Sequence, residues 1–179
     1  MLTSHQRRLG YEQDCLQQFM LESPDKLRGI KRIDDGKLLL SVAKMPALSS
    51  KPGDDWQANI AENHLVTLSF PRYYPAVPSE VFLAEPVFHP NVDPVNGFVC
   101  LWEKHRVANT VKNALAKLAA VMAWRLMNTA APHLMQPDAL TWYQSSNEIQ
   151  AKLPLSKYPW IATEMPEEMN QRPRRRRLS

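Results

Sequence analysis

Cys100 is the residue whose type and surroundings most favour covalent chemistry in this sequence. It lies at the end of residues 86–101, a stretch with three prolines and no helical or strand periodicity. Long aperiodic segments of this kind are more often functional than merely connecting. A thiolate can attack a thioester, and the new thioester keeps the acyl group activated until an amine accepts it. The sequence therefore singles out Cys100 as a candidate nucleophile.

The second cysteine and the histidines are weaker candidates. Cys15 lies in the apolar stripe of a predicted helix, where a free cysteine packs as a small hydrophobic residue. A hydrolase would need a histidine base beside Cys100. None of the five histidines has a recognisable protease context: His5, His64, His89, His105 and His133. We interpret His105 as a solvated loop histidine and Trp102 as a packing residue beside the loop.

The elements that must position Cys100 follow from hydrophobic periodicity. Apolar residues at helical spacing predict three helices, over residues 6–21, 110–127 and 137–144. Apolar and β-branched runs predict four strands, over residues 28–33, 37–45, 65–70 and 80–83. This order of helix, antiparallel strands, irregular loop and further helices is typical of an α+β fold with helices packed on one face of a sheet.

Three motifs surround the candidate nucleophile. They are Phe70-Pro71-Arg72-Tyr73-Tyr74-Pro75-Ala76-Val77-Pro78, then His89-Pro90-Asn91, then Gly97-Phe98-Val99-Cys100-Leu101. In this order they resemble the ubiquitin-conjugating enzymes, which carry Phe-Pro, Tyr-Pro-x-x-Pro, His-Pro-Asn and Gly-x-Ile/Val-Cys-Leu. The resemblance covers roughly residues 6–146. It implies an N-terminal helix, a four-stranded antiparallel meander, an active-site loop, a long central helix and shorter C-terminal helices.

The resemblance also implies a function, partners and site residues. The family accepts a ubiquitin-like modifier from an activating enzyme as a thioester, here on Cys100, and passes it to an amine of a target protein. Asn91 matches the residue that donates to the oxyanion or braces the loop, and His89 matches a structural residue of that loop. Arg7 and Arg8 match the exposed helix face on which the activating enzyme docks. Neither a cofactor nor a metal is implied.

The sequence departs from the family pattern near the site. Asn91 and Cys100 are nine positions apart, where the family commonly has eight, and residues 93–96 carry the extra one. Ala76 replaces an aromatic residue that grips ligases, and the stretch after Cys100 is short and lacks Trp-Ser-Pro-Ala. Ala130-Ala131-Pro132 stands where the family often has an acidic residue that orients the incoming lysine. These departures resemble the prokaryotic branch of the family, from bacterial ubiquitin-like conjugation operons associated with antiphage defence.

Composition limits the domain organisation and the compartment. The 179 residues, 44% hydrophobic, fit one domain, which we place at residues 1–153. Residues 154–179 are interpreted as a Pro-rich and polybasic tail with little order. The tail has five arginines between positions 172 and 177, and the net charge of the whole chain is +4. The rest of the chain is therefore nearly neutral. Two cysteines, without a signal sequence or a long apolar run, indicate a cytoplasmic protein and no membrane partner.

Two other functions compete with conjugation. A non-catalytic module of the same fold could bind a ubiquitin-like protein, but the inactive variants lack the cysteine, so Cys100 argues against this alternative. The arginines at 174–177 could bind phosphates electrostatically. The neutral body carries no nucleic-acid recognition motif, so nucleic acid is an unfavoured partner.

Overall fold

A four-stranded antiparallel sheet forms the centre of the structure, a computed structural model that describes residues 3–161. The strands are ordered β1-β2-β5-β6, with bounds Leu27–Asp34, Lys37–Val42, His64–Ser69 and Glu80–Leu83. Alternate residues of β2 and β5 are buried, which gives the sheet one apolar face. The predicted α+β fold with a four-stranded antiparallel sheet is confirmed.

The segment between β2 and β5 holds more structure than the polar connection that the sequence suggested. It contains a small antiparallel pair, β3 (Ala47–Leu48) and β4 (Ile60–Ala61), and a 3-10 turn, η1 (Gln57–Asn59). Leu48 is fully buried in a cluster of apolar side chains that also contains Phe88, Trp124 and Trp142. Such short strands carry too few residues for period-two alternation to reveal them.

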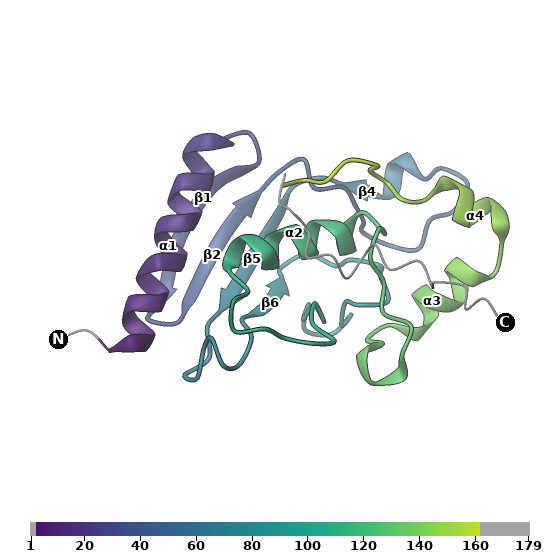
Figure 1. The fold of residues 1–179 in the computed structure, drawn as a ribbon. Helices are drawn as coiled ribbons and strands as arrows, with labels where there is room; N and C mark the ends of the chain where they lie inside the picture. The colour runs from purple at the N-terminus through teal and green to yellow at the C-terminus, as the bar shows by residue number, and fades with distance from the viewer. Residues whose placement is uncertain (1–2, 162–179) are drawn as a thin grey trace, which may run out of the picture.

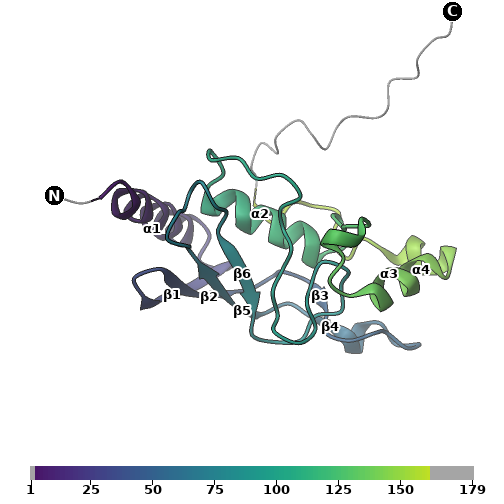
Figure 2. The same cartoon turned by 90° about the horizontal axis from the view of Figure 1, so that it is seen from below.

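Two helices cover the apolar face of the sheet, as Figure 2 shows from below. Helix α1 (Ser4–Glu22) begins at a capping box in which the side chain of Thr3 and that of Gln6 each accept the other's backbone N–H. Helix α2 (Val111–Met122) begins in the same way at Thr110. The predicted apolar face of α2 is buried along its whole length, so the central helix packs on the sheet as the periodicity indicated.

Glu12 joins α1 to α2 although it lies on an otherwise apolar face. Its carboxylate is fully buried and accepts hydrogen bonds from Arg8 Nε at 2.7 Å, the Tyr74 hydroxyl at 2.6 Å and the Val111 N–H at 2.8 Å. Burial and the neighbouring Glu12 carboxylate raise the pKa of Tyr74. Charge-assisted bonds of this kind offset the cost of burying the carboxylate. They fix the start of α2 relative to α1.

Helix α2 is shorter than predicted because the chain turns at Trp124. This residue adopts a left-handed conformation with φ of 61°, which costs a non-glycine residue on the order of 1 kcal/mol. The Trp124 ring packs against Phe88, His89 and Trp142, and this contact area offsets the strain. The turn directs the following residues back toward Cys100 instead of continuing the helix.

The C-terminal part of the structure contains a 3-10 turn and two short helices. They are η2 (Ala131–His133), α3 (Pro137–Gln144) and α4 (Asn147–Lys152), and the two helices are labelled at the right of Figure 1. The bounds of α3 match the prediction, whereas periodicity did not predict the bounds of α4. No helix among residues 3–161 is both long and apolar enough to cross a membrane.

The prediction assigned residues 154–161 to a tail, but in the structure these residues pack on the domain. Figure 1 shows this segment in yellow as it leaves α4 and runs back toward the sheet. The Trp160 indole donates to the Ala43 carbonyl at 2.9 Å, and the Trp160 carbonyl accepts from Lys26 Nζ at 2.8 Å. The Trp160 ring also meets Phe19 edge-on at 5.5 Å. Residues 162–179, the rest of the predicted tail, lie outside the described residues.

Truncation after Leu153 is therefore expected to destabilise the domain strongly. It removes two buried apolar side chains, Trp160 and Ile161, and losing one buried tryptophan alone costs about 3–5 kcal/mol. The free energy of unfolding from a denaturant titration measures the loss. Truncation after Ile161 is the matched control, and we expect it to leave the melting temperature within a few degrees. An equally stable 1–153 fragment would contradict the prediction.

Candidate active site

Cys100 lies on the returning arm of a tight loop that closes on itself. Val92 and Val99 form an antiparallel bridge, and Phe98 bridges to Phe82 on β6. Gly97 has a φ of 73°, and a side chain at this position would meet the Leu83 carbonyl oxygen at 2.1 Å. Glycine is the residue that tolerates both the positive φ and this close approach. The loop is thus tied to the sheet, and Cys100 is held at its base.

Residues 93–96, which the sequence predicts to carry the extra residue, form the tip of this loop. Asp93 accepts backbone N–H groups through both its side chain and its carbonyl, and the side chain of Asn96 accepts the Phe98 N–H at 2.8 Å. Val95 at the tip is 92% exposed. The Val92–Val99 bridge below the tip closes the base of the loop.

Asn91 ties both sides of the loop to the segment after α2. Its carbonyl accepts the Cys100 N–H at 2.8 Å, and its side-chain Nδ2 donates to the Cys100 carbonyl at 2.8 Å. Its Oδ1 accepts the Asn128 N–H at 2.7 Å. The side chain is fully buried, so these bonds are made without competition from water. In this arrangement Asn91 braces the backbone of Cys100, and its amide is directed at that backbone.

His89 lies fully buried beside Asn91. Its Nδ1 accepts the Asn91 N–H at 3.0 Å, which places the ring proton on Nε2. Its ring meets Trp124 edge-on at 4.6 Å. Burial lowers the pKa of His89 to about 3, with the Leu126 backbone acting weakly in the opposite direction. A neutral histidine in this position can brace the loop but cannot exchange protons near neutral pH.

The burial of His89 predicts a pH dependence of stability. Below about pH 6.5 the unfolded chain binds a proton at this histidine, whereas the folded protein binds it only near pH 3. The free energy of unfolding should therefore fall as the pH drops through this window, by up to about 1.4 kcal/mol per pH unit from this group. Urea titrations at several pH values measure the slope.

His89→Asn is the comparison variant, because its Oδ1 can still accept the Asn91 N–H. It is expected to be less stable at neutral pH, since it loses the ring packing on Trp124. Its slope between about pH 6 and pH 4 should be shallower than that of the wild type. Parallel slopes in the two proteins would show that His89 does not remain neutral in the fold.

Two residues that sequence reasoning did not select, Asn128 and His133, complete the surroundings of Cys100. Asn128 is buried and donates from Nδ2 to the Cys100 carbonyl at 3.1 Å and to the His133 carbonyl at 3.2 Å. His133 Nδ1 lies 3.5 Å from Cys100 Sγ. The distance of 33 residues between cysteine and histidine explains why no local spacing could have revealed the pair.

The thiol of Cys100 is buried, with 8% of the residue exposed. Burial raises the pKa of this thiol, and the Glu103 carboxylate adds to the rise. The backbone N–H of Trp102 and the side chain of Asn128 favour the thiolate and act in the opposite direction. The site holds a nucleophile between hydrogen-bond donors, and it suits acyl transfer through a covalent intermediate.

The structure corrects the interpretation of His105 and agrees with that of Trp102. His105 Nε2 donates to the Pro75 carbonyl at 2.7 Å, so this ring links two loops and is not a solvated side chain. Its ring meets Trp102 edge-on at 5.9 Å, and Trp102 packs against the main core. Cys15 is also partly buried against that core, as the helix stripe predicted.

The predicted docking residues differ in exposure. Arg7 is exposed on α1, in agreement with the expectation. Arg8 is a correction, because its side chain is 23% exposed and pairs with the buried Glu12 while donating to the Asn109 carbonyl at 2.9 Å. Reversing the charge of Arg8 would therefore disturb the contact between α1 and α2 as well as the predicted docking surface on α1.

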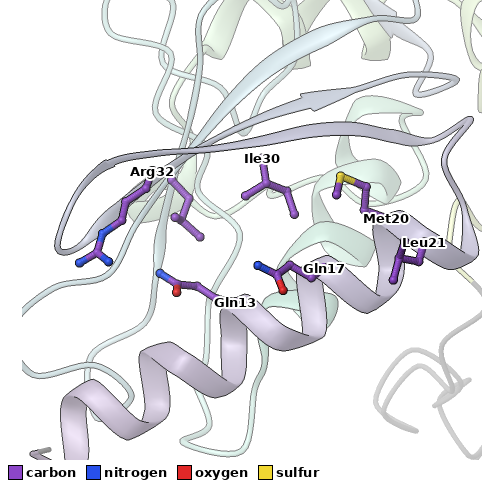
Figure 3. A pocket seen from close by; sticks show the side chains of 7 residues that line it. Gln13, Gln17, Met20, Leu21, Ile30 and Arg32 are labelled. Carbon is purple, nitrogen blue, oxygen red and sulfur yellow. The ribbon is translucent and has the colours of Figure 1, made fainter.

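A groove of about 370 Å³ lies between α1 and the outer strand β1, and Figure 3 shows it. Polar, apolar and charged side chains line it: Gln13, Gln17, Met20, Leu21, Ile30, Arg32 and Leu38. These residues come from α1, β1 and β2, away from the loop that carries Cys100. Within the described chain, no group of three or more His, Cys, Asp and Glu side chains is placed to hold a metal ion.

Comparisons with known proteins agree with the fold and with the family resemblance. A model of the family described as ubiquitin-conjugating enzyme matches residues 56–152, more than half of the chain. A candidate ubiquitin-conjugating enzyme from Plasmodium yoelii superposes with a TM-score of 0.56 at 15% identity, over 87% of this chain and 94% of that chain. A second, from Trypanosoma cruzi, gives 0.56 at 14% identity, over 82% and 92%. No curated protein matches the sequence.

The two solved structures support the fold, and the family model spans the loop that carries Cys100, Asn91 and His89. The resemblance drawn from the three motifs is thus confirmed at the level of the family. The chain belongs to the ubiquitin-conjugating enzyme family.

Proposed function

We propose that this chain is an active conjugating enzyme that carries a ubiquitin-like modifier as a thioester on Cys100 and passes it to an amine of a target protein. The observation that carries the proposal is the double anchoring of Cys100, whose N–H and carbonyl are both bonded to Asn91. This anchoring holds the nucleophile in one place in the loop. A module that only binds its partner would have no use for a thiol fixed in this way.

The reaction proceeds in two acyl transfers. In the first, Cys100 Sγ attacks the thioester carbonyl of the modifier on the activating enzyme, a new C–S bond forms, and the thiol of the activating enzyme leaves. In the second, a target amine attacks the Cys100 thioester, a C–N bond forms, and the Cys100 thiolate leaves. Both steps pass through an oxyanion that nearby N–H donors stabilise.

The family implies interaction with ubiquitin-like modifiers and with an activating enzyme. We place the docking of the activating enzyme on the exposed face of α1 around Arg7, where an exposed positive charge can steer association. The target amine approaches from the side of the thiol loop. The proposed reaction uses no cofactor on this chain and no nucleic acid.

A loading assay tests the proposal. The protein is incubated with the matching activating enzyme, the modifier and ATP, and separated on a gel without reductant. We expect a band one modifier heavier than the free protein that disappears when reductant is added. Binding of the modifier without any covalent band would favour the alternative, a non-catalytic binding module of the same fold.

We further propose that the protein belongs to the prokaryotic branch of the family and acts in antiphage defence. The support is the set of departures around the site, in particular Ala76 in place of an aromatic residue and Ala130-Ala131-Pro132 in place of an acidic one. Genes for a ubiquitin-like protein and an activating enzyme beside this one would support the placement. A phage challenge of cells that carry these genes with Cys100→Ala, compared with the wild type, tests the defence role directly.

A further inference from the structure

His133 is a titratable side chain that approaches the sulfur of Cys100. Its Nδ1 lies 3.5 Å from Sγ, within hydrogen-bond distance for sulfur. The ring is half-buried, so it borders the thiol and also meets solvent. A ring in this position can take a proton from the thiol and release it to water.

The backbone holds His133 in this place from both sides. The Asn128 side chain donates to the His133 carbonyl at 3.2 Å while it also donates to the Cys100 carbonyl. After His133, the N–H groups of Met135 and Gln136 both point at the Pro90 carbonyl, at 2.8 and 3.1 Å. The turn η2 is thus bonded to the same loop that carries the nucleophile. The approach of the imidazole to the thiol is therefore built into the fold.

We propose that His133 is a further catalytic residue of the reaction proposed above, on which this inference rests, and that it exchanges protons with the Cys100 thiol. In loading, Nδ1 of the neutral ring takes the proton from Sγ as sulfur forms its bond to the thioester carbon. The leaving thiolate of the activating enzyme then receives this proton from the imidazolium. The ring is neutral again at the end of this step.

In transfer, His133 acts on the incoming amine. The amine nitrogen bonds to the carbonyl carbon of the Cys100 thioester and gives up one proton to the imidazole as the tetrahedral intermediate forms. The C–S bond then breaks, Sγ leaves as a thiolate, and the imidazolium returns the proton to it. The products are the amide and the original thiol–imidazole pair, so the proton and the bonds balance.

The surroundings of the thiol show why a base is useful there. Burial and the Glu103 carboxylate raise the pKa of the thiol, so few molecules carry a thiolate at neutral pH without help. His89, the other histidine of this loop system, is neutral and fully buried and cannot serve. Glu103 and Lys104 follow Cys100 in the chain as exposed charges. His133 is the group that contacts the sulfur and also reaches solvent.

Alkylation of Cys100 by iodoacetamide tests the pair without modifier or activating enzyme. The experiment uses the full chain with Cys15→Ser, so that Cys100 is the reacting thiol, and follows the rate by mass spectrometry across the pH range. An imidazole that accepts the thiol proton lowers the apparent pKa of alkylation. We expect His133→Ala to raise this apparent pKa by about one unit, which corresponds to about tenfold slower alkylation at neutral pH.

Two further variants make the outcome decisive. His133→Asn keeps a hydrogen-bonding atom near the Nδ1 position without a titrating ring, and we expect it to behave like His133→Ala. Rescue of the profile by His133→Asn, or profiles that coincide in wild type and His133→Ala, would overturn the proposal. His5→Ala, which removes a half-buried histidine of α1, should leave the profile unchanged. Thermal melts confirm that each variant is folded.

The loading assay then separates this inference from the proposed function. With the matching activating enzyme and modifier, His133→Ala should slow discharge to free lysine by about a hundredfold, the lower range for loss of an acid–base group. An unchanged discharge rate would overturn the catalytic role of His133 while the conjugating function stands. Failure of the wild type to load would overturn the proposed function, whatever the alkylation profile shows.

Discussion

Cys100→Ser is expected to abolish transfer of the modifier to amines. The serine oxygen would take the place of the sulfur in a site that stays otherwise intact, because the side chain is nearly isosteric and the backbone bonds to Asn91 remain. A serine hydroxyl is a poor nucleophile at neutral pH, and an oxyester is much less reactive toward an amine than a thioester. Loss of the nucleophile in enzymes that use covalent catalysis costs on the order of a millionfold in turnover. We therefore expect either no adduct or a stable adduct that resists reductant.

The gel assay without reductant distinguishes these outcomes from the alternatives. Cys100→Ala should give no adduct at all, and Cys15→Ser should load and discharge like the wild type, because Cys15 packs against the main core. A reductant-sensitive band that survives in Cys100→Ser would assign the thioester to Cys15, the second of the two cysteines in the chain. That result would end the proposed mechanism.

The fold was predictable where periodicity is long. In β5, Val66 and Leu68 are buried on one face as the predicted alternation requires, and β6 has the predicted bounds. The face of α2 is buried as its helical spacing indicated. Each of these elements has enough residues for one face to be distinguished from the other, and burial of that face contributes most of its stability.

Periodicity failed where one residue decides the course of the chain. Trp124 ends α2 by adopting a positive φ, although the apolar pattern continues beyond it. Trp160 fixes the segment after α4 to the core, although the composition around it resembles a tail. Averages over a window describe neither a single strained residue nor a single aromatic anchor. The prediction therefore placed the end of α2 too late and did not identify the packing of residues 154–161 on the domain.

The candidate site was predictable in part because half of it is local in sequence. His89, Asn91 and Cys100 lie on one loop, and the motifs that contain them are enough to single them out. Asn128 and His133 depend on contacts between distant segments, because Asn128 donates to the Cys100 carbonyl and His133 lies beside the Cys100 thiol. Neither belongs to a motif, and each is brought to its partner by packing that the sequence does not state.

Asn91→Ala is expected to impair loading and transfer together. In the structure its side chain donates to the Cys100 carbonyl and accepts from the Asn128 N–H. Removing the side chain leaves the buried Asn128 N–H without its acceptor, which costs about 1–3 kcal/mol in stability. The Cys100 carbonyl keeps a single side-chain donor, Asn128 Nδ2 at 3.1 Å. The thiol then sits in a looser loop, and a misplacement of about 1 Å can cost about a hundredfold in rate for each step.

Separate measurements of loading and discharge distinguish two roles of Asn91, as a brace of the loop or as a direct donor to the oxyanion. Single-turnover loading and discharge to free lysine are followed independently, with the melting temperature as a check on folding. Comparable losses in both steps are the expected result for a brace. A defect of about a hundredfold or more confined to discharge would show instead that the amide turns from the Cys100 carbonyl to the developing oxyanion.

Asn128→Ala is the matched control for this experiment. It removes the second donor to the Cys100 carbonyl and the bond to the His133 carbonyl, but it keeps the backbone N–H that Asn91 Oδ1 accepts. If Asn91 and Asn128 brace the loop together, each single variant should slow loading. The loss of loading rate in the double variant should then be smaller than the product of the two single losses, because the residues share one network. Independent, multiplicative losses would show that Asn91 acts on the reaction by a separate route.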